Sequence, residues 1–382
     1  MGGDGMDDTH FYAVIMAGGS GTRLWPFSRR DRPKQMLRLG SDQTLFQQAV
    51  NRLLGVIPVE RILVVTVASQ AEALHAQFPL IPPENFLIEP APRGTAAVVG
   101  MAAVALRHRD PESTMVVVTA DHLIRNQGYF QQLLRGAYAV AQQGFLVTLG
   151  IQPTYPSSGY GYIECGEPLG MFQGCLTYRA VRFLEKPSPE RAAELLKQGN
   201  YVWNSGMFIW RTERIWEEFH RLMPELARTL DEIDQVWEPQ PYPTVAQETW
   251  LSIRQQTIDY GIMERADQVA VFPANDLGWN DVGAWDSLYD VFEENEAGNI
   301  VVSANHIGLD THGTLVVAEN PERLIVTIGA SDLMVIETGD VLLICQRDQA
   351  QKVRDVVELL KNGGSTQALG GERPGVDTER YL

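Results

Sequence analysis

The chain has 382 residues, of which 45% are hydrophobic, and it carries a formal net charge of −17 at pH 7. This length exceeds one ordinary core and predicts a large domain joined to a smaller one. The acidic balance argues against nucleic acid and against an anionic membrane as partners, because both require a basic protein face. A nucleotide substrate is compatible with this charge, since a triphosphate arrives with a divalent cation and needs only a local basic pocket.

The cysteines and the N-terminus bear on the compartment. Cys165, Cys175 and Cys345 show no paired spacing, which favours a reducing compartment over a disulfide framework or a zinc site. The first ten residues lack the basic and apolar regions of a signal peptide. No apolar run approaches the length of a membrane span. These observations predict a cytoplasmic protein.

Predicted strands and helices alternate from residue 11 to about residue 150. Short apolar runs predict strands at 12–16, 61–67, 85–88, 115–119 and 145–149. The segments between them predict helices at 45–54, 70–77, 95–107 and 129–142. This alternation predicts an α/β fold with a doubly wound, mostly parallel, Rossmann-like sheet, whose ligands lie beyond the carboxyl ends of the strands.

The amino-acid composition and the predicted elements change after residue 150. Tyrosine, glycine and proline are dense in residues 151–210 and predict hairpins that fold over a site. Helices are expected at 213–219 and 224–236, ahead of a proline-rich link at 238–243. Short β-rich runs then predict a small all-β module, either a meander or a few turns of a β-solenoid. They lie at 315–318, 324–328, 333–336 and 341–345, and an amphipathic helix at 349–360 closes the module.

A glycine-rich turn follows the first strand. It reads Ala17-Gly18-Gly19-Ser20-Gly21-Thr22-Arg23, and Pro33-Lys34 comes shortly after it. Small residues let a backbone approach a polyphosphate and aim N–H groups at it, while Arg23 and Lys34 add positive charge. The turn is not a Walker A loop, because no Gly-Lys-Ser/Thr follows, and Leu24 replaces the third glycine of a dinucleotide fingerprint. The pattern predicts a nucleoside triphosphate held by its phosphates, although a lone turn of this kind can also bind nothing.

This turn resembles the signature of the sugar-phosphate nucleotidyltransferase family, and later segments narrow the resemblance to the mannose-1-phosphate guanylyltransferases. Those segments are Thr119-Ala120-Asp121-His122, Tyr160-Gly161-Tyr162-Ile163-Glu164, Phe183-Leu184-Glu185-Lys186-Pro187, Trp203-Asn204-Ser205-Gly206-Met207-Phe208 and Trp279-Asn280-Asp281-Val282-Gly283. They occur in the family's order between residue 12 and about residue 346.

The resemblance implies a domain organisation. A GT-A-like nucleotidyltransferase domain is expected at 11–296, and a C-terminal β-helix-like module with its closing helix at 297–361. Because such modules are often used for dimer contacts in the family, a homodimer is expected. The glycine-rich residues 362–382 are expected to form a disordered tail. Bifunctional relatives add a cupin-type isomerase barrel, and this chain is expected to end too early to hold one.

The expected reaction needs no catalytic base, because a sugar phosphate with a second pKa of about 6 is already a dianion at neutral pH. The enzyme must align the attacking oxygen with the α-phosphorus, neutralise charge and help pyrophosphate to leave. The resemblance assigns Mg²⁺ to Asp121 and Asp281, the transferring phosphoryl group to Arg23 and the α-phosphate to Lys34. Either aspartate taken alone is more typical of a turn or a helix cap, and His122 is given no catalytic role.

The remaining candidates would bind GTP and α-D-mannose 1-phosphate. Phosphate contacts are assigned to Ala17, Gly18, Gly19, Gly21 and Thr22. Guanine would meet Glu89, Pro90 and Thr95, where a carboxylate or backbone carbonyl oxygen accepts hydrogen bonds from N1 and N2. The sugar phosphate is assigned to Gly161, Glu164, Glu185, Lys186 and Asn204.

Two positions depart from the pattern of many relatives. Arg93-Gly94-Thr95 stands where they carry Arg-Asn-Thr, which leaves the choice of base open, and Trp279-Asn280-Asp281 stands where they carry Trp-Ser-Asp, which keeps the aspartate. One rival hypothesis is therefore a sibling enzyme with another hexose 1-phosphate or base. Another is a non-catalytic regulatory subunit of the same fold, although such proteins typically lose a cationic residue or a metal aspartate. A dinucleotide-dependent oxidoreductase is disfavoured by the missing third glycine.

Overall fold

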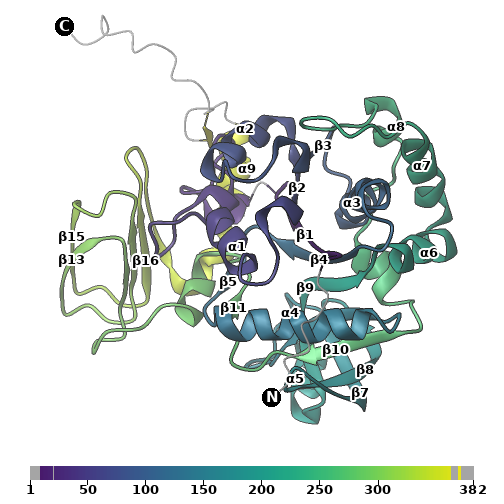
Figure 1. Ribbon diagram of the computed structural model, residues 1–382. Coiled ribbons are helices and arrows are strands. Elements are labelled where there is room, and N and C mark those ends of the chain that lie inside the picture. Colours follow the sequence, from purple (N-terminus) through teal and green to yellow (C-terminus); the bar gives the residue numbers. More distant parts are fainter. Residues whose placement is uncertain (1–8, 20, 363–368, 371–382) are drawn as a thin grey trace, which may run out of the picture. The chain divides into compact units, whose positions relative to one another are not determined.

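The computed structural model of the chain is shown in Figure 1 and describes residues 9–19, 21–362 and 369–370. Contacts divide the chain into two compact units. As far as they are described, the first comprises residues 1–18, 49–120 and 124–279, and the second comprises 19–48, 121–123 and 280–382. Most of the glycine-rich turn therefore groups with the C-terminal part of the chain. The domain bounds expected at 296 and 361 stay a prediction, and the tail expected at 362–382 lies almost wholly outside the described residues.

The first unit is built on a sheet with the strand order β3-β2-β1-β4-β9-β6-β10-β8-β7. Its strands are β1 (Phe11–Met16), β2 (Ile62–Val67), β3 (Phe86–Glu89), β4 (Thr114–Thr119), β6 (Leu146–Ile151), β7 (Tyr162–Phe172), β8 (Cys175–Leu184), β9 (Tyr201–Arg211) and β10 (Val269–Pro273). Parallel pairing joins β3, β2, β1 and β4, and also joins β6 to β10. β9 runs antiparallel between β4 and β6. The expected Rossmann-like α/β class is confirmed, with its parallel strands gathered around β1.

The central strands are apolar along their whole length because they are covered on both faces. β1 is buried from Phe11 to Ile15 and β4 from Thr114 to Val118, as in strands buried on both sides. α3 (Thr95–Arg109) packs against β1, β2 and β3. Every residue from Ala96 to Leu106 is buried, as in a helix that is enclosed on all sides, and the helix predicted at 95–107 is confirmed.

The other helices connect these strands or close the second unit. They are α1 (Leu45–Leu53), α2 (Ala68–Gln77), α4 (Gln127–Ala141), α5 (Pro189–Gln198), α6 (Thr212–Leu222), α7 (Pro224–Gln235), α8 (Gln247–Leu251) and α9 (Val353–Asn362). Short helical turns are η1 (Thr22–Leu24), η2 (Lys34–Met36), η3 (Val59–Arg61), η4 (Pro83–Asn85), η5 (Asp259–Met263), η6 (Trp285–Asp290) and η7 (Arg347–Lys352). None of the helices in the described part of the chain combines the length and apolar character that a membrane crossing needs.

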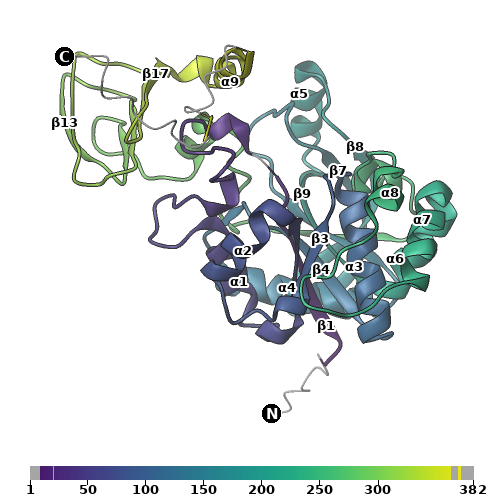
Figure 2. The same ribbon diagram turned by 90° about the horizontal axis from the view of Figure 1, so that it is seen from above.

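The second unit contains a β-solenoid, which we define as residues 300–346 (Figure 2). Its strands are β12 (Ile300–Val302), β13 (Asn305–Leu309), β14 (Leu315–Ala318), β15 (Leu324–Ile328), β16 (Leu333–Glu337) and β17 (Leu342–Gln346). β14 pairs in parallel with both β12 and β16, and β13 pairs in parallel with β15. Parallel pairing of strands from successive coils is the arrangement of a solenoid, so the meander considered from the sequence is wrong. β17 then returns antiparallel to β16.

The core of the second unit joins the solenoid to the segment after the glycine-rich turn. Leu24, Trp25 and Phe27 pack in one buried cluster with residues of the solenoid and of α9. Trp285 Nε1 donates a hydrogen bond to the carbonyl oxygen of Trp25 at 2.8 Å. The backbone of residues 24–27 is therefore anchored in this core. β5 (Leu123–Ile124) and β11 (Trp279–Asn280) pair with each other in a separate two-stranded sheet.

Candidate active site

The glycine-rich turn starts at the carboxyl end of β1, where Ala17 is fixed to β2. The N–H of Ala17 donates to the carbonyl oxygen of Val65 at 2.8 Å, and its own carbonyl oxygen accepts from Thr66 Oγ1 at 3.0 Å. A Cβ at Gly18 would lie 2.6 Å from Glu89 Oε1, so glycine is needed for the ends of β1 and β3 to approach. The turn thereby begins beside Glu89, which the sequence assigns to the same nucleotide.

Glu89 is a buried carboxylic acid at the end of β3. Its side chain is 2% exposed, and desolvation raises its pKa to about 7, although a hydrogen bond with the backbone of Arg93 opposes the shift. Among the described residues, Glu89 Oε2 and Arg93 Nε are both buried without a hydrogen-bond partner. Buried polar atoms are rarely left unpaired in a native protein, because each costs stability. Glu89 and Arg93 stand at the two ends of the segment 89–93. A polar ligand could give both unpaired atoms a hydrogen-bond partner.

Gly94 is required by its backbone conformation and by a close neighbour. Its φ of 86° and ψ of 167° lie in a region that is essentially restricted to glycine. A Cβ at this position would overlap the carbonyl oxygen of Gln256. The departure from the Arg-Asn-Thr of many relatives is thus explained by the approach of residues 254–257. Next to it, Thr95 Oγ1 accepts a hydrogen bond from the N–H of Ile258 at 2.9 Å.

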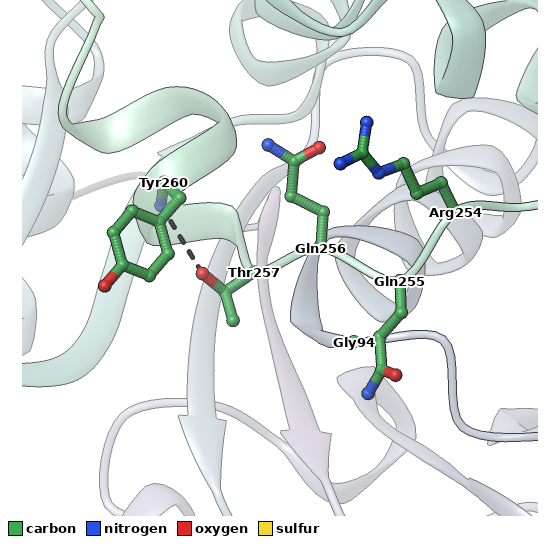
Figure 3. Close-up of a pocket in the computed structure, with 6 residues that line it drawn as sticks. All are labelled: Gly94, Arg254, Gln255, Gln256, Thr257 and Tyr260. Atoms are coloured by element: carbon green, nitrogen blue, oxygen red, sulfur yellow. Dashed lines mark hydrogen bonds between the residues drawn. The ribbon is translucent and has the colours of Figure 1, made fainter.

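The same neighbour lines a pocket with a volume of about 510 Å³. Its lining residues are Gly94, Arg254, Gln255, Gln256, Thr257 and Tyr260 (Figure 3). In Figure 3 the side chain of Gln256 lies between those of Tyr260 and Arg254, and the N–H of Tyr260 donates to Thr257 Oγ1 at 3.4 Å. Sequence reasoning missed the 254–260 segment, since it carries no recognisable motif and lies more than 150 residues from Gly94.

Lys34 links three segments within the second unit. It opens η2 directly after Pro33, and its side chain is only 9% exposed. Its Nζ donates to Asp121 Oδ2 at 2.8 Å and to the backbone carbonyl oxygen of Asp281 at 2.5 Å. Gly21 has a φ of 59°, and a Cβ there would overlap the Cβ of Lys34. Three residues that the sequence selects as catalytic candidates therefore meet at one ammonium group.

The turn that carries Asp281 is held in a strained conformation. Val282 has a φ of 46°, which is an outlier for a β-branched residue and costs on the order of 1–3 kcal/mol. Its side chain is fully buried, and its N–H donates to Asn280 Oδ1 at 2.6 Å. The N–H of Gly283 donates to Asp281 Oδ1 at 3.2 Å. Asn280 thus acts as the cap of this turn, which gives a structural reason for asparagine at a position where many relatives carry serine.

Three further candidates, Gly19, Arg23 and Pro90, are more exposed to solvent than Lys34 and Glu89. Arg23 belongs to η1 and is exposed, so its guanidinium is open to solvent on the segment that leads to Lys34. Gly19 is also exposed, and a Cβ there would meet nothing within 4 Å. Pro90 is half-buried after Glu89. These placements leave the roles of the three residues as predictions from the motif.

A second group of candidates meets in the first unit around Asn204. The N–H of Asn204 donates to the carbonyl oxygen of Gly161 at 2.8 Å, and its Nδ2 donates to Asp259 Oδ1 at 2.6 Å. A Cβ at Gly161 would overlap Glu185 Oε2. Gly161, Glu185 and Asn204 are therefore brought together, as the motifs predict. Asp259 was missed from the sequence; it opens the π-helical η5, a distortion that is frequent at functional sites.

Electrostatics in this group favour the neutral forms of the acids. Burial raises the pKa of Asp259, and the hydrogen bond from Asn204 opposes the shift. Burial also raises the pKa of Glu185, with a further contribution from the charge of Asp259, while Lys186 opposes it. Lys186 Nζ lies 3.5 Å from Glu185 Oε1 and its side chain is 64% exposed. The contacts of Glu164 differ, because its carboxylate accepts from Tyr201 Oη at 2.9 Å.

Two known protein families match this chain, each over a different part of its length. Residues 12–298 match the family model described as nucleotidyl transferase, and residues 304–360 match the model described as MannoseP isomerase/GMP-like beta-helix domain. The chain belongs to the nucleotidyl transferase family. This assignment confirms the enzyme class and the family that the motifs indicate.

The nucleotidyltransferase is also similar to individual curated proteins. It is 37% identical over 368 residues to the mannose-1-phosphate guanylyltransferase of Escherichia coli (strain K12), and 38% identical over 369 residues to the mannose-1-phosphate guanylyltransferase ManC of Salmonella typhimurium. Each match covers 94% of this chain and 75% of the relative. A crystal structure of a mannose-1-phosphate geranyltransferase from Thermus thermophilus is 35% identical with a TM-score of 0.83, covering 92% of this chain and 99% of that chain.

The nucleotidyltransferase family generally uses a divalent metal ion, and the acidic residues at Lys34 are suited to one. Within the described residues, no group of three or more His, Cys, Asp or Glu side chains could hold a metal by itself. Mg²⁺ is typically bound by only one or two carboxylates, with substrate phosphates and water as the other ligands. Asp121 and Asp281 carry carboxylates of this kind, and Lys34 links the Asp121 carboxylate to the backbone of Asp281, so the types of donor present fit such an ion.

Proposed function

We propose that this nucleotidyltransferase transfers GMP from GTP to α-D-mannose 1-phosphate, giving GDP-mannose and pyrophosphate. The observation that carries the proposal is that Lys34 Nζ contacts Asp121 Oδ2 at 2.8 Å and the backbone carbonyl oxygen of Asp281 at 2.5 Å. A further support is the similarity of nearly the whole chain to proteins named mannose-1-phosphate guanylyltransferase.

The transfer is an in-line displacement. A phosphate oxygen of the sugar phosphate attacks the α-phosphorus of GTP, and the bond from that phosphorus to the oxygen that bridges to the β-phosphate breaks, so pyrophosphate leaves. The chain's task is to hold both partners in line and to stabilise negative charge. Lys34 would contact the α-phosphate, and Arg23, which is exposed on the same segment, would contact the departing pyrophosphate.

The charge of the Lys34 group explains the expected need for a cation. The Lys34–Asp121 ion pair is formally neutral, and the Asp281 carboxylate in the neighbouring turn adds one negative charge, so these residues offer no net positive charge to a triphosphate. A divalent ion held by Asp121 and Asp281, for which we propose Mg²⁺, would supply the positive charge that reverses this sign. Arg23 adds to the same effect. Turnover should therefore be absent when divalent ions are chelated.

Guanine is proposed to lie near Glu89 and the turn at Gly94. An ionised Glu89 would accept the N1 and N2 hydrogens of guanine, which gives its unpaired Oε2 a partner. Adenine lacks this pair of donors, so the contact would discriminate against it. Thr95 and Pro90 would line the same region. The backbone conformation at Gly94 disfavours asparagine, so the contacts that select the base would come from Glu89 and its neighbours.

Mannose 1-phosphate is proposed to meet Gly161, Glu185 and Asn204. Side chains that donate and accept hydrogen bonds suit sugar hydroxyl groups, and the exposed Lys186 ammonium would contact the phosphate. Glu164 is kept as a candidate for the hexose. Asp259 would act by orienting the amide of Asn204, since the two are joined at 2.6 Å.

We also propose that the protein is a cytoplasmic homodimer. Exposed apolar side chains alternate along β13 and β15, with Ile307 and Leu309 on one strand and Val326 and Ile328 on the other. A second copy of this chain would cover them through the matching strands. Cys165, Cys175 and Cys345 all carry free thiols, which suits a reducing compartment.

The proposal is tested by measuring pyrophosphate release with Mg²⁺ and a matrix of substrates. GTP, UTP, dTTP and ATP are each paired with mannose 1-phosphate and with glucose 1-phosphate. We expect the highest kcat/KM with GTP and mannose 1-phosphate. A different preferred pair would refute the base or hexose assignment while keeping the reaction class. No release with any pair, from folded protein, would refute the proposal in favour of a regulatory subunit of the same fold.

A further inference from the structure

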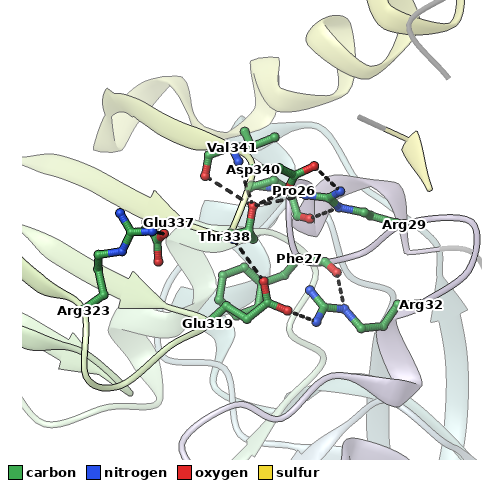
Figure 4. A network of polar contacts seen from close by, with 11 residues as sticks. Pro26, Phe27, Arg29, Arg32, Glu319, Arg323, Glu337, Thr338, Asp340 and Val341 are labelled. Atoms are coloured by element: carbon green, nitrogen blue, oxygen red, sulfur yellow. Dashed lines mark hydrogen bonds and ion pairs between the residues drawn. The ribbon is translucent and has the colours of Figure 1, made fainter. Parts of the chain in front are cut away.

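Two arginines between the glycine-rich turn and Lys34 are bound to the solenoid (Figure 4). Arg29 Nη1 donates to Asp340 Oδ2 at 2.7 Å and Arg29 Nη2 donates to Asp340 Oδ1 at 2.5 Å. Arg29 Nη2 also donates to Thr338 Oγ1 at 3.1 Å. Arg32 forms a second ion pair, with Glu319. The loop 26–33 is thus joined to the solenoid at two points, both within the second unit.

Each arginine also forms a hydrogen bond with the backbone of the loop 26–33, in which both residues lie. Arg29 Nε donates to the carbonyl oxygen of Pro26 at 2.9 Å, and Arg32 Nε donates to that of Phe27 at 3.1 Å. The N–H of Arg29 donates to the carbonyl oxygen of Arg32 at 2.9 Å, and the reverse bond is 3.2 Å long. Because a guanidinium is planar and its donors are fixed relative to one another, each one sets the position of the loop backbone against the solenoid carboxylate.

The solenoid side of this contact is itself well ordered by hydrogen bonds. Asp340 lies in the turn between the paired strands β16 and β17. In that turn the N–H of Thr338 donates to the carbonyl oxygen of Val341 at 2.8 Å, and Thr338 Oγ1 donates to Asp340 Oδ1 at 3.2 Å. The hydrogen bonds from Arg29 hold the pKa of Asp340 below its usual value.

This ion pair differs from an ordinary surface pair. Most exposed pairs are worth little, because two long side chains must be ordered in water. The Arg29 side chain is only 13% exposed, and its two-point contact with the carboxylate is the geometry that gives an ion pair both strength and direction. Arg29 and Asp340 are 311 residues apart in sequence, so the pair fixes a long-range arrangement of the chain.

The loop ends at a residue of the candidate active site. One residue after Arg32, Pro33 leads into Lys34, whose Nζ contacts Asp121 and the backbone of Asp281. Arg23 precedes the loop, and the buried residues Leu24 and Trp25 lie between them. A shift of the loop would therefore move Lys34, one of the two cations that are proposed to contact the triphosphate. A misplacement of about 1 Å in a catalytic group can cost on the order of 100-fold in rate.

We propose that Arg29 and Asp340 are positioning residues for GMP transfer, and that the solenoid turn at 338–341 is a fixed support for the loop 26–33, which leads into Lys34. The inference rests on the proposed function and deepens it, because it gives the solenoid a part in binding the triphosphate. The pair Arg32–Glu319 supports the same loop a few residues nearer to Lys34. Only the nucleotide side of the reaction depends on this support.

The test compares variants of the pair by steady-state kinetics on the full chain. Asp340→Asn keeps the shape of the side chain and removes its charge, Arg29→Lys keeps the charge and removes the two-point contact, and Arg29→Asp with Asp340→Arg exchanges the partners. Asp231→Asn is the matched control, since Asp231 is 42% exposed in its ion pair with His220 and Asp340 is 44% exposed.

We expect Asp340→Asn and Arg29→Lys to lower kcat/KM for GTP by about 10-fold, while KM for mannose 1-phosphate changes by less than about 2-fold. The exchanged pair should recover part of the loss, and Asp231→Asn should behave as the wild type. Hydrogen exchange of the backbone amides in residues 21–36 should become faster in Asp340→Asn. A purely structural role would change the thermal midpoint without separating the two KM values.

Two results separate failure of this inference from failure of the proposed function. If the wild type transfers GMP and Asp340→Asn has the same kinetic constants, the inference is wrong and the function stands. If the wild type releases no pyrophosphate, the proposed function is wrong, and hydrogen exchange still decides whether the solenoid holds the loop. Unchanged exchange in residues 21–36 of Asp340→Asn overturns the inference in either case.

Discussion

Replacement of Glu89 by glutamine should make the protein more stable at alkaline pH. The pKa of Glu89 rises from 4.5 to about 7 in the folded protein because the carboxyl group is buried. Between these two values the unfolded chain has released the proton and the folded chain still binds it, so the stability of the wild type falls as pH rises. A pKa rise of about 2.5 corresponds to about 3 kcal/mol. Glutamine cannot ionise, so the variant avoids this loss.

The assay is urea unfolding of wild type and Glu89→Gln at pH values from 5 to 9, followed by tryptophan fluorescence. The difference between the two proteins at each pH removes the contributions of all other titrating groups. This difference should change in favour of the variant by about 2.5 kcal/mol between pH 5 and pH 7.5 and should change little above that pH. GTP should reduce the change, because the donors of guanine favour the ionised carboxylate.

A difference that does not vary with pH would refute the reasoning, since it would mean that Glu89 ionises at an ordinary pKa. A difference that shifts in favour of the wild type with rising pH would refute it more strongly. That sign requires the carboxylate, not the carboxylic acid, to be the form that the fold stabilises. Either result would mean that Glu89 is already ionised in the folded protein near neutral pH, before any nucleotide binds.

Other perturbations test separate parts of the site. Gly94→Asn puts a side chain where the backbone is restricted to glycine, so it should lower stability by about 1–3 kcal/mol; an unchanged thermal midpoint would contradict this. Lys34→Met should lower kcat by about 100-fold or more while circular dichroism stays that of the wild type, and a smaller loss would argue against phosphate contact. Asp259→Asn should raise KM for mannose 1-phosphate by about 10-fold and leave KM for GTP unchanged; equal effects on both would argue against a role at the sugar. Burial raises the pKa of Cys165 to about 11, so its thiol should resist iodoacetamide at pH 8 until the protein is unfolded, as measured by mass spectrometry.

The sequence was sufficient to predict the elements whose signals are local. Continuous apolar runs identified β1 and β4, and a helix that is apolar on every face identified α3. The motifs also selected Lys34, Asp121 and Asp281, which meet in space. Such features need no knowledge of pairing, because each depends on a short stretch of chain or on a family signature.

The features that could not be predicted depend on contacts between distant segments. Parallel pairing of β12, β14 and β16 distinguishes a solenoid from a meander, and no local pattern encodes it. The reason for Gly94 lies in the carbonyl oxygen of Gln256, and the partner of Arg29 lies 311 residues away. The positive φ of Val282 could not be predicted from the sequence either, since valine disfavours that conformation and only the surrounding core imposes it.

The central claim is that the group formed by Lys34, Asp121 and Asp281 carries out the transfer with a divalent ion. Its most direct test is kcat of Asp281→Asn, measured by pyrophosphate release from GTP and mannose 1-phosphate over a range of Mg²⁺ concentrations. We predict a loss of at least about 100-fold that more Mg²⁺ restores only in part, in a protein with the wild-type unfolding midpoint. A variant with near-normal kcat at the wild-type Mg²⁺ concentration would contradict it.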